Sequence, residues 1–108
     1  MEFHLTGQHL ALSDALKAYT ERRLGCALAG IAQHLKEVDI RLSDVNGPRG
    51  GIDKSCAIRV AIRRLGVVFA SAKGVDAYAT IDRAASRIRS VLTRRLRSPT
   101  RRRPPGPT

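Results

Sequence analysis

Residues 74–96 carry the clearest hydrophobic pattern in the chain. Their apolar side chains recur at spacings of three and four, which is typical of a helix with one buried face. These residues are Ala77, Ile81, Ala84, Ala85, Ile88 and Leu92. The opposite side of the same helix carries Arg83, Arg87, Arg94 and Arg97, with Ser86 and Ser90 between them. The pattern therefore predicts an amphipathic helix with a row of guanidinium groups on its polar side. Asp76 in its first turn suits the positive end of the helix dipole.

A second helix is predicted from Ser13 onward, because Ser13 can cap the first free amides and Asp14 suits the first turn. Its apolar stripe comprises Leu16, Tyr19, Thr20, Leu24, Ala27 and Leu28. Gly25 and Gly30 weaken helical structure, so we expect this helix to end between Cys26 and Gly30.

Four further segments alternate polar and apolar residues, which is the pattern of half-buried strands. They are residues 2–6, 38–43, 54–64 and 67–73, with a tight turn at Leu65 and Gly66 before the last one. The resulting order is β-α-β-β-β-α. Alternating strands give a sheet one apolar face, so both helices must cover that face in a two-layer α+β fold with a four-stranded sheet. The strands flanking the first helix are expected to be parallel, and the last three to form a meander.

The length of 108 residues, with 43% hydrophobic side chains, allows one small domain with its own core, which we assign to residues 1–96. Residues 97–108 contain four prolines and three consecutive arginines, and this composition predicts a disordered basic tail. Residues 46–51 form a glycine-rich loop without the Gly-Lys-Ser/Thr ending of a nucleotide-binding P-loop. A hairpin connection is therefore favoured there over a loop that contacts RNA.

The chain is strongly basic, with a formal net charge of +11 and a pI near 11.2. From Arg83 to the end of the sequence there are nine arginines and no Asp or Glu, whereas residues 1–82 hold 11 basic and nine acidic residues. A helix face that is merely solvated usually mixes the two signs for pairing at i,i+4. The arginine row therefore favours a surface that binds a polyanion over one that only keeps the protein in solution.

The sequence favours a cytoplasmic protein without membrane contact. Its apolar runs stay below the roughly 18 residues of a membrane-spanning helix, and its first residues lack the basic start and apolar core of a secretory signal. In that compartment Cys26 and Cys56 are expected to be free thiols.

Catalysis, a cofactor, a bound metal and a small-molecule substrate are not expected. His4, His9 and His34 share no metal-ligand spacing with one another or with the cysteines. Asp76 and Asp82 lie six residues apart on one helix, so they do not face each other as a catalytic pair would.

Three blocks of the sequence resemble the ribosome hibernation-promoting factors and the related ribosome-associated inhibitor A, the sigma-54 modulation protein family. They are Leu5-Thr6-Gly7 with Ala15-Leu16, then Ala70-Ser71-Ala72, then Gly74-x-Asp76-x-Tyr78-Ala79-x-Ile81-Asp82. The similarity covers roughly residues 1–96 in one register, with the element order that periodicity already predicts.

The resemblance implies a stress-response protein that binds rRNA of the small ribosomal subunit in the decoding region and blocks messenger and transfer RNA. It implies a short form, without the C-terminal dimerisation domain of long-form members, that is monomeric when free. In the family, basic residues on both helices contact rRNA phosphates, and the matching positions here are Lys17, Arg23, Arg87 and Arg94. Relatives often carry a basic residue at the positions of Cys26 and Ser90, and we expect Arg22, Arg83 and Arg97 to compensate.

The alternative is a general module for structured or double-stranded RNA that does not act on ribosomes. A reader of single-stranded RNA on the sheet would need outward-facing aromatic residues for base stacking. Phe69 is the one aromatic residue that the alternation can place on the outer face of the sheet. The sequence leaves two alternatives open for Tyr78: its hydroxyl contacts RNA, or its ring packs over the edge of the sheet.

Overall fold

The computed structural model describes residues 1–44 and 54–97. The chain runs through strand β1 (Glu2–Gln8), helix α1 (Asp14–Ala27), the short 3₁₀ helix η1 (Ala32–His34), strands β2 (Leu35–Asp44), β3 (Lys54–Ile62) and β4 (Gly66–Gly74), and helix α2 (Ala77–Arg97). The predicted order of strands and helices is confirmed, and η1 is an addition to it. The end of α1 at Ala27 and the cap at Ser13, whose hydroxyl accepts from the Leu16 amide at 3.1 Å, are also as predicted.

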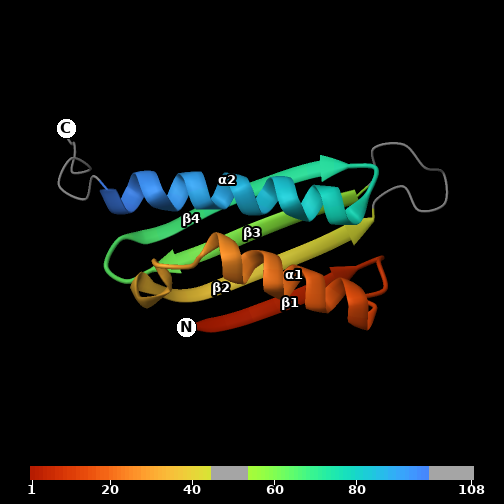
Figure 1. Cartoon of the computed structure of the whole chain (residues 1–108), viewed down its shortest axis with the longest axis horizontal. Helices are drawn as coiled ribbons and strands as arrows, with labels where there is room; N and C mark the ends of the chain where they lie inside the picture. The colour runs from red at the N-terminus through yellow and green to blue at the C-terminus, as the bar shows by residue number, and fades with distance from the viewer. Residues whose placement is uncertain (45–53, 98–108) are drawn as a thin grey trace.

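The four strands form one sheet in the order β1-β2-β3-β4 (Figure 1). Strands β1 and β2 are parallel, with Phe3 opposite Val38, while β2, β3 and β4 pair antiparallel in sequence order. The predicted parallel crossover and meander are therefore both present. Strands β1 and β4 are the two edges of this sheet.

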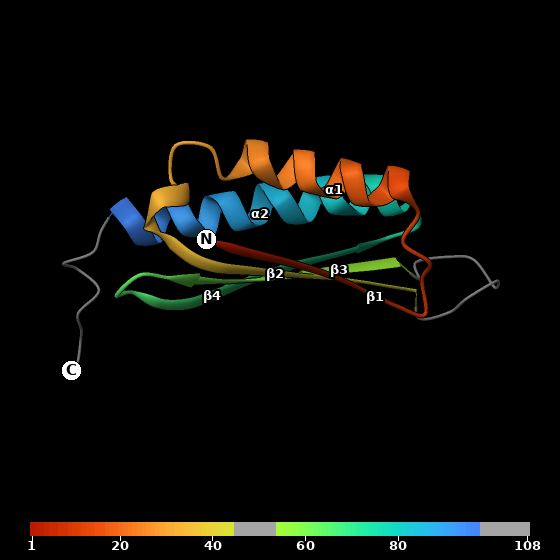
Figure 2. The same ribbon diagram turned by 90° about the horizontal axis from the view of Figure 1, so that it is seen from below.

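Both helices lie side by side on one face of the sheet and leave the other face open (Figure 2). The core between the two layers is built from the alternate residues that the pattern predicts. Its members include Val38, Ile40, Leu42, Cys56, Ile58, Val60 and Ile62 from the sheet, and Leu16, Leu24, Ile81, Ala84, Ala85, Ile88 and Leu92 from the helices. On the open face the side chain of Phe69 is 67% exposed, as the alternation predicts.

Several boundaries differ from the sequence prediction. Strand β1 continues to Gln8 and β2 begins at Leu35, and the elements beside two turns are also shifted. Strand β3 ends at Ile62, two residues earlier than expected, because the chain reverses through Arg64 and Gly66, which have φ of 68° and 85°. The long helix begins at Ala77 rather than near residue 74, because Gly74 still belongs to β4. A Cβ atom on Gly74 would lie 2.6 Å from the hydroxyl of Thr80, so only glycine allows this close approach of strand and helix.

Asp76 precedes the helix and caps it, since its carboxylate accepts from the Ala79 amide at 3.0 Å. At the other end Arg97, assigned to the tail by composition, is the last residue of α2. The remainder of the predicted tail, residues 98–108, and the predicted loop at 46–51 lie outside the described residues.

Candidate nucleic-acid interface

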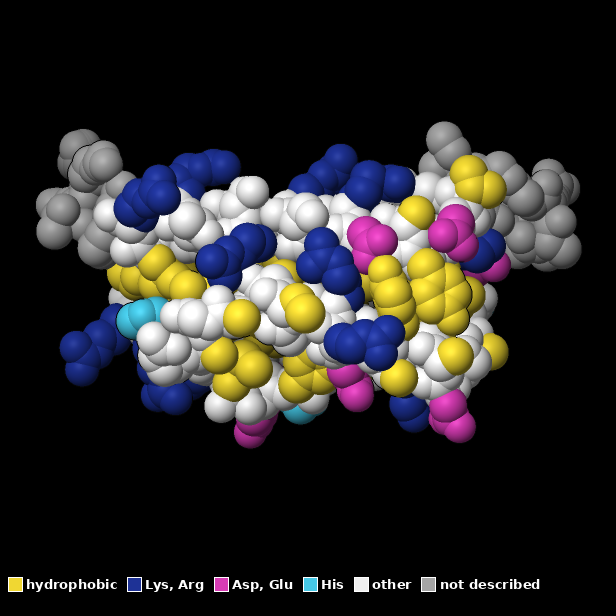
Figure 3. Space-filling model, in the orientation of Figure 1, with side chains coloured by type: hydrophobic (Ala, Val, Ile, Leu, Met, Phe, Trp, Pro, Cys, Tyr) yellow, Lys and Arg dark blue, Asp and Glu magenta, His cyan; other side chains and the backbone are white. Residues whose placement is uncertain are grey.

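Helix α2 carries six arginines and a single acidic residue, Asp82. The four arginines predicted to form its polar row, Arg83, Arg87, Arg94 and Arg97, are all exposed. Within residues 1–44 and 54–97, none of the four forms an ion pair with a carboxylate. Lysine and arginine side chains gather along α2 and between the two helices on this side of the molecule (Figure 3). The helical layer therefore presents positive charge that the described part of the chain does not neutralise.

Two arginines of the row contact the edge strand. Arg87 donates from Nη1 to the carbonyl oxygen of Ser71 at 2.6 Å, and Arg83 donates from Nη2 to the carbonyl of Lys73. Because β4 is an edge strand, some of its backbone groups have no strand partner, and these bonds satisfy two of them. A guanidinium has five N–H donors, so each arginine keeps donors for a further acceptor while its position is fixed.

Two other arginines of α2 were not singled out by the sequence, and the structure gives them contacts within the fold. Arg89 donates from Nη1 to the carbonyls of Ala27 and Ala29 at 3.0 and 2.9 Å, which satisfies carbonyls at the end of α1. Arg95 donates to the carbonyl of Leu65 at 2.5 Å and so fastens the turn between β3 and β4. The helical periodicity places Arg89 and Arg95 outside the face that carries the arginine row, so the sequence alone could have distinguished them from the row.

Helix α1 supplies the other three predicted residues. Lys17 and Arg22 are exposed, and the guanidinium carbon of Arg22 lies 5.9 Å from the centre of the Tyr19 ring, in cation–π range. Arg23 is half-buried, and its Nε lies 3.2 Å from Oδ1 of Asp82 on α2. Lys17 and Arg22 thus face solvent, whereas Arg23 is already paired.

Tyr19, Arg23 and Asp82 form a polar link between the two helices, which we call the interhelical clasp. The Tyr19 hydroxyl donates to Oδ1 of Asp82 at 2.5 Å, and the same oxygen accepts from Arg23. This hydrogen bond, with some desolvation and the nearby negative charge, raises the pKa of Tyr19 above its ordinary value. The ring of Tyr78 packs edge-on against Tyr19 with centroids 4.9 Å apart, so it lies against α1 rather than over the sheet edge.

Both cysteines are free thiols, as predicted. Cys56 is a core residue, and burial raises the pKa of its thiol to about 12. It is therefore protonated and unreactive near neutral pH. Cys26 lies exposed near the end of α1.

Residues 3–98 match the family described as Sigma 54 modulation protein / S30EA ribosomal protein. The chain belongs to this family. Membership confirms the resemblance to hibernation-promoting factors seen in the three sequence blocks.

Relatives of this S30EA-family chain include a chloroplast protein of spinach, the ribosome-binding factor PSRP1, which is 30% identical over 95 residues. That match covers 86% of this chain but only 30% of the spinach protein, so this chain spans about a third of its relative's length. Among solved structures, a ribosomal subunit interface protein from Coxiella burnetii shares the fold with a TM-score of 0.77 at 22% identity, covering 90% of this chain and 99% of the other. The N-terminal domain of Protein Y from Thermus thermophilus gives a TM-score of 0.68 at 26% identity, covering 87% and 98%.

None of the helices within residues 1–44 and 54–97 is both long enough and apolar enough to cross a membrane.

Proposed function

We propose that this protein binds ribosomes and inhibits translation, with the arginine face of its two helices set against rRNA of the small subunit in the decoding region. There the folded domain occupies space that messenger and transfer RNA need. The inhibition is steric, because the contacts hold the folded domain in place and no covalent bond is made or broken.

The observation that carries the proposal is the unneutralised arginine row of α2. Arg94 and Arg97 are exposed and have no hydrogen-bond or ion-pair partner among the described residues, and Arg83 and Arg87 are held on backbone carbonyls with donors to spare. Arginine suits structured RNA, because its planar fork pairs with phosphate oxygens in a bidentate manner and stays charged at all physiological pH values. Family membership supports the ribosome as the source of that RNA.

The shape of the surface favours structured RNA over a single strand. The guanidinium groups stand on two packed helices whose spacing is fixed by the core and the interhelical clasp. Fixed charges recognise the spacing of phosphates in a folded RNA, not its base sequence. A sheet that reads single-stranded bases would need several stacking aromatics, and the described part of the open face offers Phe69.

The test is co-sedimentation with small ribosomal subunits over a series of salt concentrations, with in vitro translation alongside. The double variant Arg87→Glu/Arg94→Glu should bind more weakly at every salt concentration. The slope of log affinity against log salt should fall by roughly two, since about one counterion is released for each phosphate contact. Because Arg87 also contacts β4, Arg94→Glu/Arg97→Glu serves as a companion that leaves this contact intact.

The matched control is Arg41→Glu/Arg63→Glu. It makes the same change in charge at two exposed residues, one on the open face of β2 and one in the turn after β3. This control should bind and inhibit nearly as well as the wild type. Equal sedimentation of all three double variants would refute the assignment of the face. Tight binding to any RNA duplex, without inhibition of translation, would favour the general RNA-binding module instead.

A further inference from the structure

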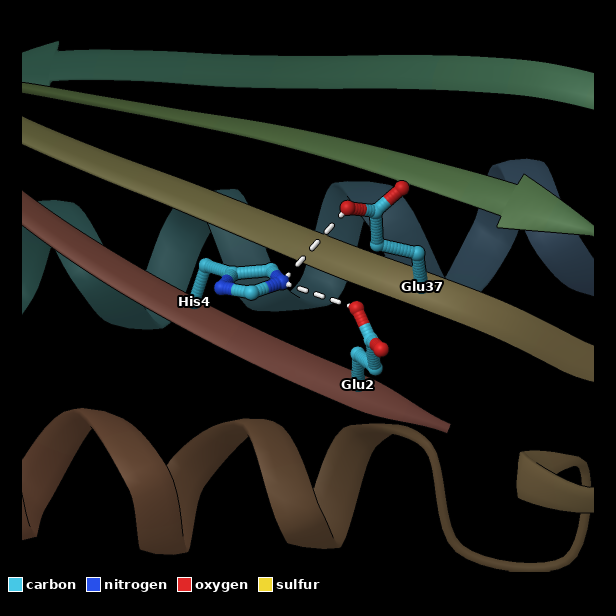
Figure 4. A group of neighbouring side chains, drawn as sticks. All are labelled: Glu2, His4 and Glu37. Carbon is cyan, nitrogen blue, oxygen red and sulfur yellow. Dashed lines mark hydrogen bonds and ion pairs between the residues drawn. The ribbon is translucent and has the colours of Figure 1, made fainter.

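A cluster of possible metal ligands lies on the open face of the sheet, on the side opposite the arginine face. It comprises His4 and Glu2 of β1 and Glu37 of β2 (Figure 4). The Nε2 atom of His4 lies 3.3 Å from Oε1 of Glu2 and 3.5 Å from Oε2 of Glu37. These three donor atoms all lie within 4.8 Å of one another.

The strands themselves bring the three side chains together. Glu2 and His4 are two residues apart in β1 and so share a face. Phe3, which lies between them, and Leu5, which follows His4, pack toward the core. Glu2 pairs with Glu37 in the parallel register. An irregularity in β2 between Leu35 and Glu37 keeps both Leu35 and Val38 buried and leaves Glu37 on the open face.

A second contact orients the Glu37 carboxylate. Its other oxygen, Oε1, lies 3.5 Å from Nη1 of Arg59 on β3, and Arg59 also donates to Asp39 at 2.9 Å. The two oxygens of Glu37 therefore face different groups, Oε1 toward Arg59 and Oε2 toward His4. Metal-binding carboxylates are commonly held in this way by an outer partner.

The two carboxylates share one imidazole nitrogen. A neutral imidazole has at most one N–H at Nε2, yet that nitrogen faces two carboxylate oxygens at nearly equal distances. A metal ion between the three donors would contact the imidazole nitrogen and both carboxylate oxygens at once. Ligands bonded at about 2.0–2.2 Å in a tetrahedral site are about 3.4 Å apart, which matches both distances from His4.

We propose that Glu2, His4 and Glu37 form a binding site for a divalent transition-metal ion of the zinc type. One imidazole nitrogen and two carboxylate oxygens are a donor set that such ions accept, and Glu2, at 75% exposure, is free to close on the ion. Water fills the remaining coordination positions. The ion joins β1 to β2 and so holds the N-terminal edge strand on the sheet, on the face away from the proposed RNA surface.

The proposal is tested by calorimetric titration of ZnCl2 into tag-free protein at pH 7.5, with thermal unfolding measured in parallel. All proteins carry Cys26→Ser, so that the exposed thiol cannot bind zinc. The parent should bind one zinc ion per chain, and its unfolding midpoint should rise with zinc concentration, because a ligand that binds only the folded state stabilises it. MgCl2 should have little effect, because magnesium prefers oxygen ligands.

Two variants and one control decide the outcome. His4→Gln and Glu37→Gln should each weaken zinc binding at least about tenfold. The control His34→Gln removes an exposed histidine of η1 and should bind as the parent does. Circular dichroism checks that each variant is folded.

Three results would overturn the proposal: no saturable zinc binding, unchanged binding in both cluster variants, or equal loss in the His34 control. A fourth is an unfolding midpoint that zinc leaves unchanged in the parent protein. Ribosome binding is not part of the readout, so these results are independent of the proposed function.

Discussion

Replacing Asp82 with asparagine should lower stability and raise RNA affinity in the same protein. Asp82 is the one acidic residue of α2, and its Oδ1 accepts from the Tyr19 hydroxyl at 2.5 Å and from Arg23 Nε at 3.2 Å. Asparagine keeps a carbonyl oxygen at this position but has no charge. The interhelical clasp therefore loses its ion pair. Arg23 keeps the hydrogen bond from Nη2 to the Ser86 hydroxyl at 3.2 Å, but its charge is no longer paired and can attract another anion.

The expected loss of stability is modest, because water screens the pair. The side chains of Arg23 and Asp82 are 29% and 45% exposed, and pairs of this kind contribute between a few tenths and about 1 kcal/mol. With the weaker hydrogen bonds included, we expect a decrease of about 1 kcal/mol in the free energy of unfolding. In a domain of this size that corresponds to a midpoint about 4–8 °C lower.

RNA binding should change in the opposite direction. The substitution removes one negative charge from the helical layer and leaves the charge of Arg23 without a carboxylate partner. One additional phosphate contact should steepen the slope of log affinity against log salt by roughly one. The gain should therefore be largest at low salt and shrink as salt is added.

Thermal unfolding and filter binding to small subunits at several salt concentrations measure the two effects, and two controls separate their causes. Tyr19→Phe removes a clasp hydrogen bond without changing charge, so it should lower the midpoint and leave the salt slope unchanged. Asp76→Asn removes one negative charge, as Asp82→Asn does, but it keeps the helix cap, because asparagine caps a helix as well as aspartate does. It should leave both the midpoint and the slope nearly unchanged. An Asp82→Asn variant with wild-type midpoint and wild-type slope would show that the clasp does not hold Arg23.

Alkaline pH should weaken the bond between Tyr19 and Asp82. The pKa of Tyr19 is raised from 10.0, so the stabilisation is complete below pH 10 and is lost as the pH rises through the folded-state value. In thermal melts, the midpoint difference between wild type and Tyr19→Phe should therefore shrink above pH 10; a constant difference would contradict this. Iodoacetamide at pH 8 should alkylate only Cys26 in the folded protein and also Cys56 in denaturant, as mass spectrometry can count, because burial raises the pKa of Cys56 to about 12. Arg87→Gln should increase aggregation by light scattering more than Arg94→Gln does, because Arg87, unlike Arg94, contacts the edge of β4; equal scattering would refute that role.

The fold could be predicted from the sequence because its information is local. Alternation in the strands and the spacing of three and four in α2 each depend on neighbouring residues, and Ser13 caps α1 within one turn. Burial then requires both helices on one side of the sheet. The start of α2 was missed by three residues, because the close approach of Gly74 to Thr80 is not visible in a periodic pattern.

The partners of individual charges could not be predicted in the same way. Asp82 lies 63 residues from Tyr19 and 59 from Arg23 in the sequence. The sequence therefore gives no sign that Arg23 is paired, although it is paired in the fold. His4 shows no ligand spacing along the chain, because its neighbour Glu37 arrives through the register of a different strand. Such pairs become visible only when the packing of whole elements is known.

The arginines of α2 connect the fold with the proposed function, and the connection explains why lysine would not replace them. Arg83 and Arg87 each place one end of a guanidinium on a carbonyl of β4 and keep other N–H donors outward, whereas a lysine ammonium has no such planar fork. A side chain held in this way loses less conformational entropy when it meets a phosphate. Under the proposed function, the contacts that protect the sheet edge would therefore also position the helix face for RNA. A lysine at position 87 would keep the charge but should bind the small subunit more weakly than arginine, through lost positioning and not through lost attraction.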